Sequence, residues 1–167
     1  MNYIKTDEHY KSIVEDILEN DEFNKIKDIE HHGVTRFDHS VKVSYYSYKI
    51  SKALGLDYLQ TARGGLLHDF FLSEEERTTK DRLVSTFVHP KKAVEKAQEQ
   101  FNLTKKEADM IRSHMFPINL SVPRYLESWV VSMVDKWIGL MEFNKKYSYQ
   151  IKTVMNLYAI FLINNMR

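Results

Sequence analysis

The sequence contains no cysteine, and it is poor in glycine and proline. Without cysteine, disulfides, thiolate nucleophiles and cysteine-based zinc sites are excluded, so any metal ion must be held by nitrogen and oxygen. Only 5 glycines and 3 prolines occur among 167 residues. This scarcity favours long helices over a turn-rich β fold.

The chain also lacks a strong net charge and a long apolar run. Its 24 Lys and Arg oppose 23 Asp and Glu, so charge gives no argument for a nucleic acid polymer or a membrane as partner. The longest apolar run, residues 157–163, is too short to span a bilayer, and the polar, acidic N-terminus is unlike a signal peptide. We therefore expect one soluble, cytoplasmic domain over residues 1–167.

Apolar residues recur at helical spacing along most of the chain, which predicts an all-α fold of about six to seven helices. The expected helices cover residues 7–30, 37–54 and 57–72, then start at Pro90 and at Thr104, and finally cover 125–143 and 147–165. The first and last of these are expected to pack on a central core of about residues 30–142.

Some boundaries follow from local signals. Residues 73–88 are charged and lack a clear period, which predicts a surface loop. Pro90 suits the first position of a helix, so His89 is expected at the N-cap. Thr104 and Glu107 form a capping-box pair. The helix over 125–143 is apolar almost all round, and we expect it to be central and buried.

The dipeptide His68-Asp69 stands out because it sits in an otherwise apolar, glycine-containing stretch that is expected to be helical. Gly64 and Gly65 lie just before it, and each costs a helix roughly 0.5–1 kcal/mol relative to alanine. Two such glycines indicate that a helix backbone or a ligand comes close. An imidazole and a carboxylate in such surroundings need a partner, and a divalent metal ion would satisfy both.

Further histidines and an aspartate lie in comparable places. Asp135 sits within an apolar helix with no opposite charge nearby except Lys136, which points elsewhere at the next helical position. The whole candidate set comprises His39, His68, Asp69, His89, His114 and Asp135. Imidazole and carboxylate ligands suit a divalent ion such as Fe, Mn, Co, Ni, Zn or Mg.

The order and local context of these residues resemble the HD-domain phosphohydrolase superfamily. The matching segments are Arg36–Val43, Gly65–Asp69, His89–Ala93, Ile111–Met115 and Val134–Lys136. The resemblance implies an all-α fold with one or two divalent metals. It also implies hydrolysis of a nucleotide or other small phosphate ester through a metal-activated hydroxide.

The resemblance further assigns roles to residues. His39, His68, Asp69 and Asp135 would hold a first metal, and His89 and His114 would hold a second, with Asp69 as the bridge. Asp69, His68 and Lys136 are the expected catalytic residues. The candidates for binding substrate phosphate are Arg36, Arg63, Lys91, Arg124 and His32. Phe70-Phe71-Leu72 lacks the acid or the Ile-Gly-Lys found in better-defined branches, so their substrates are not carried over.

Other interpretations stay open at this point. The chain can be a non-catalytic nucleotide- or metal-binding signalling module, or a structural helical protein with no ligand. In the structural case His39 and Asp135 would form a buried polar pair, His89 a helix N-cap and His114 a helix C-terminal cation. The apolar C-terminal helix can belong to the core or to the surface of a homodimer.

Overall fold

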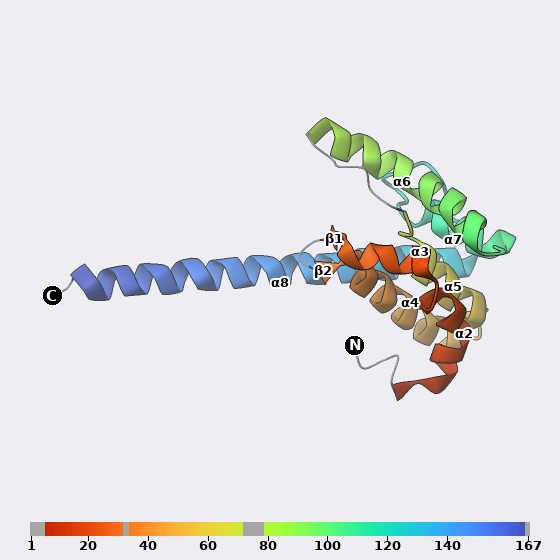
Figure 1. Ribbon diagram of the computed structural model, residues 1–167, viewed down its shortest axis with the longest axis horizontal. Coiled ribbons are helices and arrows are strands. Elements are labelled where there is room, and N and C mark those ends of the chain that lie inside the picture. Colours follow the sequence, from red (N-terminus) through yellow and green to blue (C-terminus); the bar gives the residue numbers. More distant parts are fainter. Residues whose placement is uncertain (1–5, 32–33, 72–78, 166–167) are drawn as a thin grey trace.

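The computed structural model describes the backbone of residues 6–31, 34–71 and 79–165 (Figure 1). These residues form seven α-helices, a short 3₁₀ helix and a two-stranded ladder. The elements are α2 (Glu8–Leu18), α3 (Asp21–Asn24), η1 (Lys25–Asp28), β1 (Glu30–His31), β2 (Val34–Thr35), α4 (Arg36–Ala53), α5 (Tyr58–Leu67), α6 (Thr79–Gln100), α7 (Lys105–Ser113) and α8 (Leu126–Asn165). The prediction of an all-α fold is confirmed.

The N-terminal segment is not the single helix predicted over residues 7–30. The Asp7 side chain caps α2 by accepting from the backbone N–H of Tyr10 at 3.0 Å. The Asn20 side chain then accepts from the backbone N–H of Phe23 at 2.9 Å and starts α3. A capping side chain of this kind begins a new helix. The spacing of apolar residues does not report such a cap, so periodicity alone predicted one continuous helix.

Helices α4 and α5 pack with their backbones nearly in contact. A Cβ added at Gly65 would lie 3.1 Å from the Cα of Ser44, and one at Gly64 would meet the side chain of Met110. The glycines indicated a close helix backbone or a ligand, and at Gly65 the structure shows the helix backbone. Because α4 turns its serine face to α5, its apolar residues Tyr46 and Ile50 are exposed.

Helix α6 corrects two predictions. It runs without interruption from Thr79 to Gln100, so residues 79–88 are helical rather than a loop, and residues 72–78 lie outside the described part. Pro90 lies inside α6, and His89 is therefore an interior helical residue and no N-cap. A proline removes one helical N–H donor, but here α6 continues through it and packs against α7.

Helix α8 corrects two further predictions. It is continuous over 40 residues, where two helices were predicted; no glycine or proline separates residues 143 and 147. It is also not buried all round. Val131, Val134 and Ile138 are buried, whereas Met133 and Trp137 on another face are exposed. Figure 1 shows the C-terminal half of α8 reaching away from the other elements.

Across the part of the chain that was searched, no helix combines the length and apolar character that crossing a membrane requires.

Candidate metal centre

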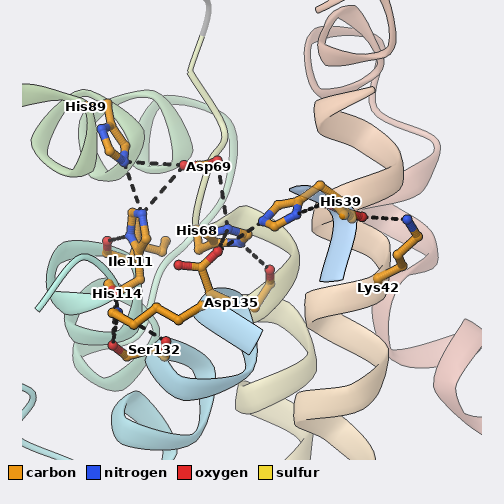
Figure 2. Close-up of polar contacts among 12 residues, drawn as sticks. His39, Lys42, His68, Asp69, His89, Ile111, His114, Ser132 and Asp135 are labelled. Atoms are coloured by element: carbon orange, nitrogen blue, oxygen red, sulfur yellow. Dashed lines mark hydrogen bonds and ion pairs between the residues drawn. The ribbon is translucent and has the colours of Figure 1, made fainter. Parts of the chain in front are cut away.

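Five helices or helix ends bring the six predicted ligands together (Figure 2). His39 lies in the first turns of α4, His89 in α6 and Asp135 in α8. His68 and His114 are the C-cap residues of α5 and α7. Because α5 ends at Leu67, His68 and Asp69 lie at a turn rather than within a helix, and both are buried.

Ligand atoms from these residues form overlapping clusters. In each cluster the atoms lie within 4.8 Å of one another, and the groups are His39–His68–Asp69, His68–His114–Asp135 and Asp69–His89–His114. Asp69, His68 and His114 each belong to two groups. Nitrogen and oxygen donors at this spacing suit one divalent ion or two neighbouring ones.

Backbone carbonyls fix the orientation of two of the imidazoles. His68 Nδ1 lies 2.8 Å from the carbonyl oxygen of Gly65, and His114 Nδ1 lies 2.7 Å from that of Ile111. Since a carbonyl can only accept, each Nδ1 must carry the proton. The lone pair of each Nε2 therefore faces the centre, as a metal ligand requires.

The His68 Nε2 atom shows that the centre fits a cation. It is buried and has no hydrogen-bond partner among the described residues. The nearest carboxylate oxygens are Asp135 Oδ1 at 3.6 Å and Asp69 Oδ2 at 3.9 Å. A lone pair and two carboxylates facing one another leave a strongly unfavourable concentration of acceptors. A metal ion at this position would give the His68 lone pair a partner and neutralise the charge of the two carboxylates.

Asp69 faces both halves of the centre. Its Oδ2 lies toward His68, while its Oδ1 lies 3.5 Å from both His89 Nε2 and His114 Nε2. These two nitrogens are 3.1 Å apart. One carboxylate with an oxygen toward each cluster has the arrangement of a bridging ligand.

Burial and neighbouring charges shift the pKa values at the centre in opposite directions. Burial and the nearby His68 lower the pKa of His114 to about 4, so His114 is neutral at pH 7, as a ligand must be. Burial also lowers the pKa of His39, but hydrogen bonds to Asp135 and Glu142 outweigh it and raise the pKa to about 10. Burial opposes ionisation of Asp135, but the hydrogen bond from His39 outweighs it and lowers the Asp135 pKa.

Glu142 is a functional residue that the sequence analysis missed. Its Oε2 lies 2.8 Å from His39 Nδ1, and its other oxygen pairs with Lys42. His39 Nε2 lies 3.0 Å from Asp135 Oδ1, so Glu142 binds the ring nitrogen that faces away from the centre. The available signal was the interval of seven residues between Asp135 and Glu142, which places two acids on one face of a helix.

Lys136, predicted to be catalytic, is bound to the backbone. Its Nζ donates to the carbonyl oxygen of His114 at 2.7 Å and to the Ser132 hydroxyl at 2.8 Å. Burial lowers the pKa of Lys136. In this position the ammonium ties the end of α7, which carries His114, to α8.

Two of the predicted phosphate-binding cations have other partners. Arg36 is buried, stacks on the Phe71 ring and donates to the Phe71 carbonyl oxygen at 2.6 Å. Phe71 in turn stacks on His89, so Arg36 lies behind the wall of the centre. Arg63 forms a bidentate pair with Asp16 and contacts Glu107, away from the cluster.

The remaining predicted cations are not gathered at the centre. Lys91 is exposed and pairs with Glu95. Arg124 is exposed and, with Lys105 and Arg112, lines a separate hollow beside α7. His32 lies outside the described residues.

Comparison with known proteins agrees with this geometry. A family model described as HD domain matches residues 36–142, which is more than half of the chain. A search of curated proteins and a search of solved structures each gave no match. The matched segment begins at Arg36, where α4 begins, and ends at Glu142, so it contains every residue of the cluster. The chain belongs to the HD domain family.

Proposed function

We propose that this protein is a metal-dependent phosphohydrolase that acts on a nucleotide or another small phosphate ester. The observation that carries the proposal is the position of Asp69, with one oxygen toward His68 and the other toward His89 and His114. Two divalent ions held by these residues would stabilise both the attacking and the leaving oxygen of a phosphoryl displacement. Membership of the HD domain family supports the same reaction class.

The residues of this chain would bind and orient the ions. His39, His68, Asp69 and Asp135 would hold the first, and Asp69, His89 and His114 the second. Divalent ions there would supply Lewis-acid activation of water and neutralise phosphate charge. The carbonyls of Gly65 and Ile111 keep Nε2 of His68 and His114 free of a proton, and Glu142 holds the His39 ring.

The depth of the centre supports a small substrate. Asp69 is only 5% exposed and His89 only 9% exposed. A terminal phosphate of a small molecule can approach ligands covered to this extent more closely than the backbone of a folded nucleic acid strand can. We therefore propose a phosphomonoester or a small phosphodiester as the substrate.

The test combines metal analysis with a panel of substrates. Protein loaded in turn with Mn²⁺, Fe²⁺, Ni²⁺ or Zn²⁺ would be assayed on nucleoside mono-, di- and triphosphates, cyclic nucleotides and sugar phosphates. We expect turnover on at least one class and its loss in Asp69→Asn. The matched control is Asp109→Asn, because Asp109 lies outside the cluster and accepts hydrogen bonds from Arg124 and Ser128.

The results separate the proposal from its alternatives. Metal bound at one or two equivalents without turnover on any class would favour a binding module over an enzyme. Absence of metal, with no rise in Tm when any of the ions is added, would leave a structural role. Full activity in Asp69→Asn would show that the chemistry lies elsewhere.

A further inference from the structure

An exposed apolar line runs along the outer face of α8. Met133 is 67% exposed, Trp137 65%, Leu140 55% and Tyr147 55%. These side chains lie on the side of α8 opposite to Val131 and Ile138, which pack into the body. Isolated exposed apolar residues are ordinary, but a contiguous line of large ones indicates an interaction surface.

The sequence continues this line along the whole helix with a strict alternation of four- and three-residue steps. The positions are Leu126, Val130, Met133, Trp137, Leu140, Asn144, Tyr147, Ile151, Val154, Tyr158, Phe161 and Asn165. All are large apolar or aromatic residues except the two asparagines. A mean spacing of 3.5 residues is the heptad pattern of a helix that packs along another helix. We call these twelve positions the α8 seam.

The first half of the α8 seam borders a groove. A cavity of about 710 Å³ lies between α4 and α8. Its apolar walls are formed by Tyr46 and Ile50 from α4 and by Met133, Trp137 and Met141 from α8. The ion pair between Lys42 and Glu142 also lines it. The groove is thus apolar, open and parallel to the seam, which suits an apolar helix.

The second half of α8 has no described element beside it in Figure 1. In proteins most of the stability of a helix comes from packing of its apolar face rather than from intrinsic helix propensity. Residues 143–165 contain no Asp or Glu, and the seam positions continue through them. This half of the helix therefore needs a partner that covers a heptad face.

We propose that the partner is a second copy of this chain, and that two α8 helices pair antiparallel about a two-fold axis. Full overlap of the twelve seam positions places Leu126 of one copy beside Asn165 of the other, with the axis between residues 145 and 146. The C-terminal half of each helix then lies in the α4–α8 groove of the other copy. One surface thereby supplies both the apolar helix and the groove, as a closed two-fold interface requires.

The antiparallel direction follows from the shape of the protomer. The N-terminal half of α8 is flanked by α4, while the C-terminal half projects alone. A parallel pair would press the two flanked halves together and leave both grooves without a helix. Opposite directions instead bring a projecting half to each groove.

Oligomeric state tests the interface. The full chain, with its metal, would be measured by sedimentation velocity over a concentration series. We expect a dimer that Trp137→Glu and Leu140→Glu convert to monomer, while metal content stays unchanged as evidence of an intact fold. The matched control is Leu120→Glu, because Leu120 is 93% exposed and lies outside the seam. It should remain dimeric.

Cross-linking tests the direction, and the absence of native cysteine makes each introduced thiol unique. In the antiparallel pair, residues 144 of the two copies lie about 4.5 Å apart along the axis, whereas residues 133 lie about 38 Å apart. A short bis-maleimide should therefore link Asn144→Cys dimers and not Met133→Cys dimers. Linking both would establish a parallel pair and overturn the proposal.

Two further results would overturn the proposal. A wild-type chain that is monomeric at every concentration excludes the self-pairing. A monomeric chain that also co-sediments with phosphatidylserine vesicles, and loses this on Trp137→Glu, would identify a lipid surface as the partner of the seam.

Discussion

Glu142 Oε2 lies 2.8 Å from His39 Nδ1, across the contact between α8 and α4. Because Lys42 pairs with the other carboxylate oxygen, Glu142 stays ionised and can only accept. In the metal-free protein His39 therefore donates from Nδ1 to Glu142 and from Nε2 to Asp135, and a bound metal ion would take the place of the Nε2 proton. One buried acid, 6% exposed at its side chain, thus sets the orientation and basicity of a metal ligand on another helix.

Glu142→Ala is expected to weaken metal binding by about 10–100-fold, since loss of such an outer partner has this effect in other metal sites. Chelator competition on the purified protein measures the affinity. Glu142→Gln should lose less metal affinity than Glu142→Ala, because its amide oxygen can still accept a hydrogen bond from His39 Nδ1. The matched control is Glu127→Gln, a buried acid of α8 that binds Lys106 and the Asp57 N–H instead. Equal affinity in Glu142→Ala and wild type would contradict the assigned role.

The number of metal ions follows from the three overlapping clusters. His89 belongs only to the group with Asp69 and His114. We therefore expect His89→Gln to reduce the bound metal from two equivalents to one, as measured by elemental analysis after gel filtration. His9→Gln is the control, because His9 is exposed, lies outside the three groups and has its ring against Tyr48 and Tyr58. Two equivalents in both variants would place the second ion elsewhere.

Lys136 was expected to be catalytic, and its contacts predict a different outcome for its removal. Lys136→Met loses the hydrogen bonds to the His114 carbonyl and to Ser132. We expect the free energy of unfolding to fall by about 1 kcal/mol and metal affinity to fall with it. Denaturant unfolding and chelator competition provide these values. A fall in kcat with both quantities unchanged would instead support direct catalysis by the ammonium.

The pKa shifts predict how the stability of the metal-free protein depends on pH. The pKa of His114 in the folded protein is about 4, below its ordinary 6.5. Its contribution to the free energy of unfolding is therefore lost as pH falls from 6.5 towards 4. The folded pKa of His39 is about 10, so its contribution is lost as pH rises from 6.5 towards 10. Stability should therefore be greatest near pH 6.5.

Urea unfolding of chelator-treated protein across this pH range measures both sides of the maximum. On each side of the maximum, the free energy of unfolding is expected to fall by about 1–3 kcal/mol. His114→Gln should flatten the acidic side above pH 4 and leave the alkaline side in place. A curve that is flat from pH 5 to 9 would contradict the electrostatic assignment.

The sequence singled out the residues that meet at the candidate centre because several of them are local anomalies. His39 and Asp135 interrupt apolar helical faces, and a polar group there must have a partner. The helix ends at Thr104 and Gly55 also carried their own signals: a capping box is present at Thr104, and Gly55 has a φ of +68°.

The features that were missed depend on contacts between distant elements. Pro90 resembles a helix start in sequence, yet packing of α6 on α7 keeps it inside a helix. Arg36 and Arg63 resemble free cations, but the Phe71 carbonyl and Asp16 bind them. The apolar residues of α8 predicted burial on all sides, although only one face packs on the body. A sequence shows which residues need partners but not which partners they find.

The close approach of α4 and α5 gives a prediction that separates backbone proximity from helix propensity. Gly65→Ala would place a methyl group 3.1 Å from the Cα of Ser44, a backbone atom that cannot turn aside. We expect α5 to shift and the free energy of unfolding to fall by about 1–3 kcal/mol. Because Gly65 O also fixes His68 Nδ1, metal affinity should fall as well.

Gly139 provides the matched control, since it lies within α8 and a Cβ there would meet nothing within 4 Å. Gly139→Ala should raise the free energy of unfolding by roughly 0.5–1 kcal/mol, because alanine restricts the unfolded chain and favours the helix. Thermal and denaturant unfolding of the two variants give the comparison. If Gly65→Ala were stabilising like Gly139→Ala, the contact between α4 and α5 would have to be looser than 3.1 Å implies, and the rigid placement of His68 would lose its support.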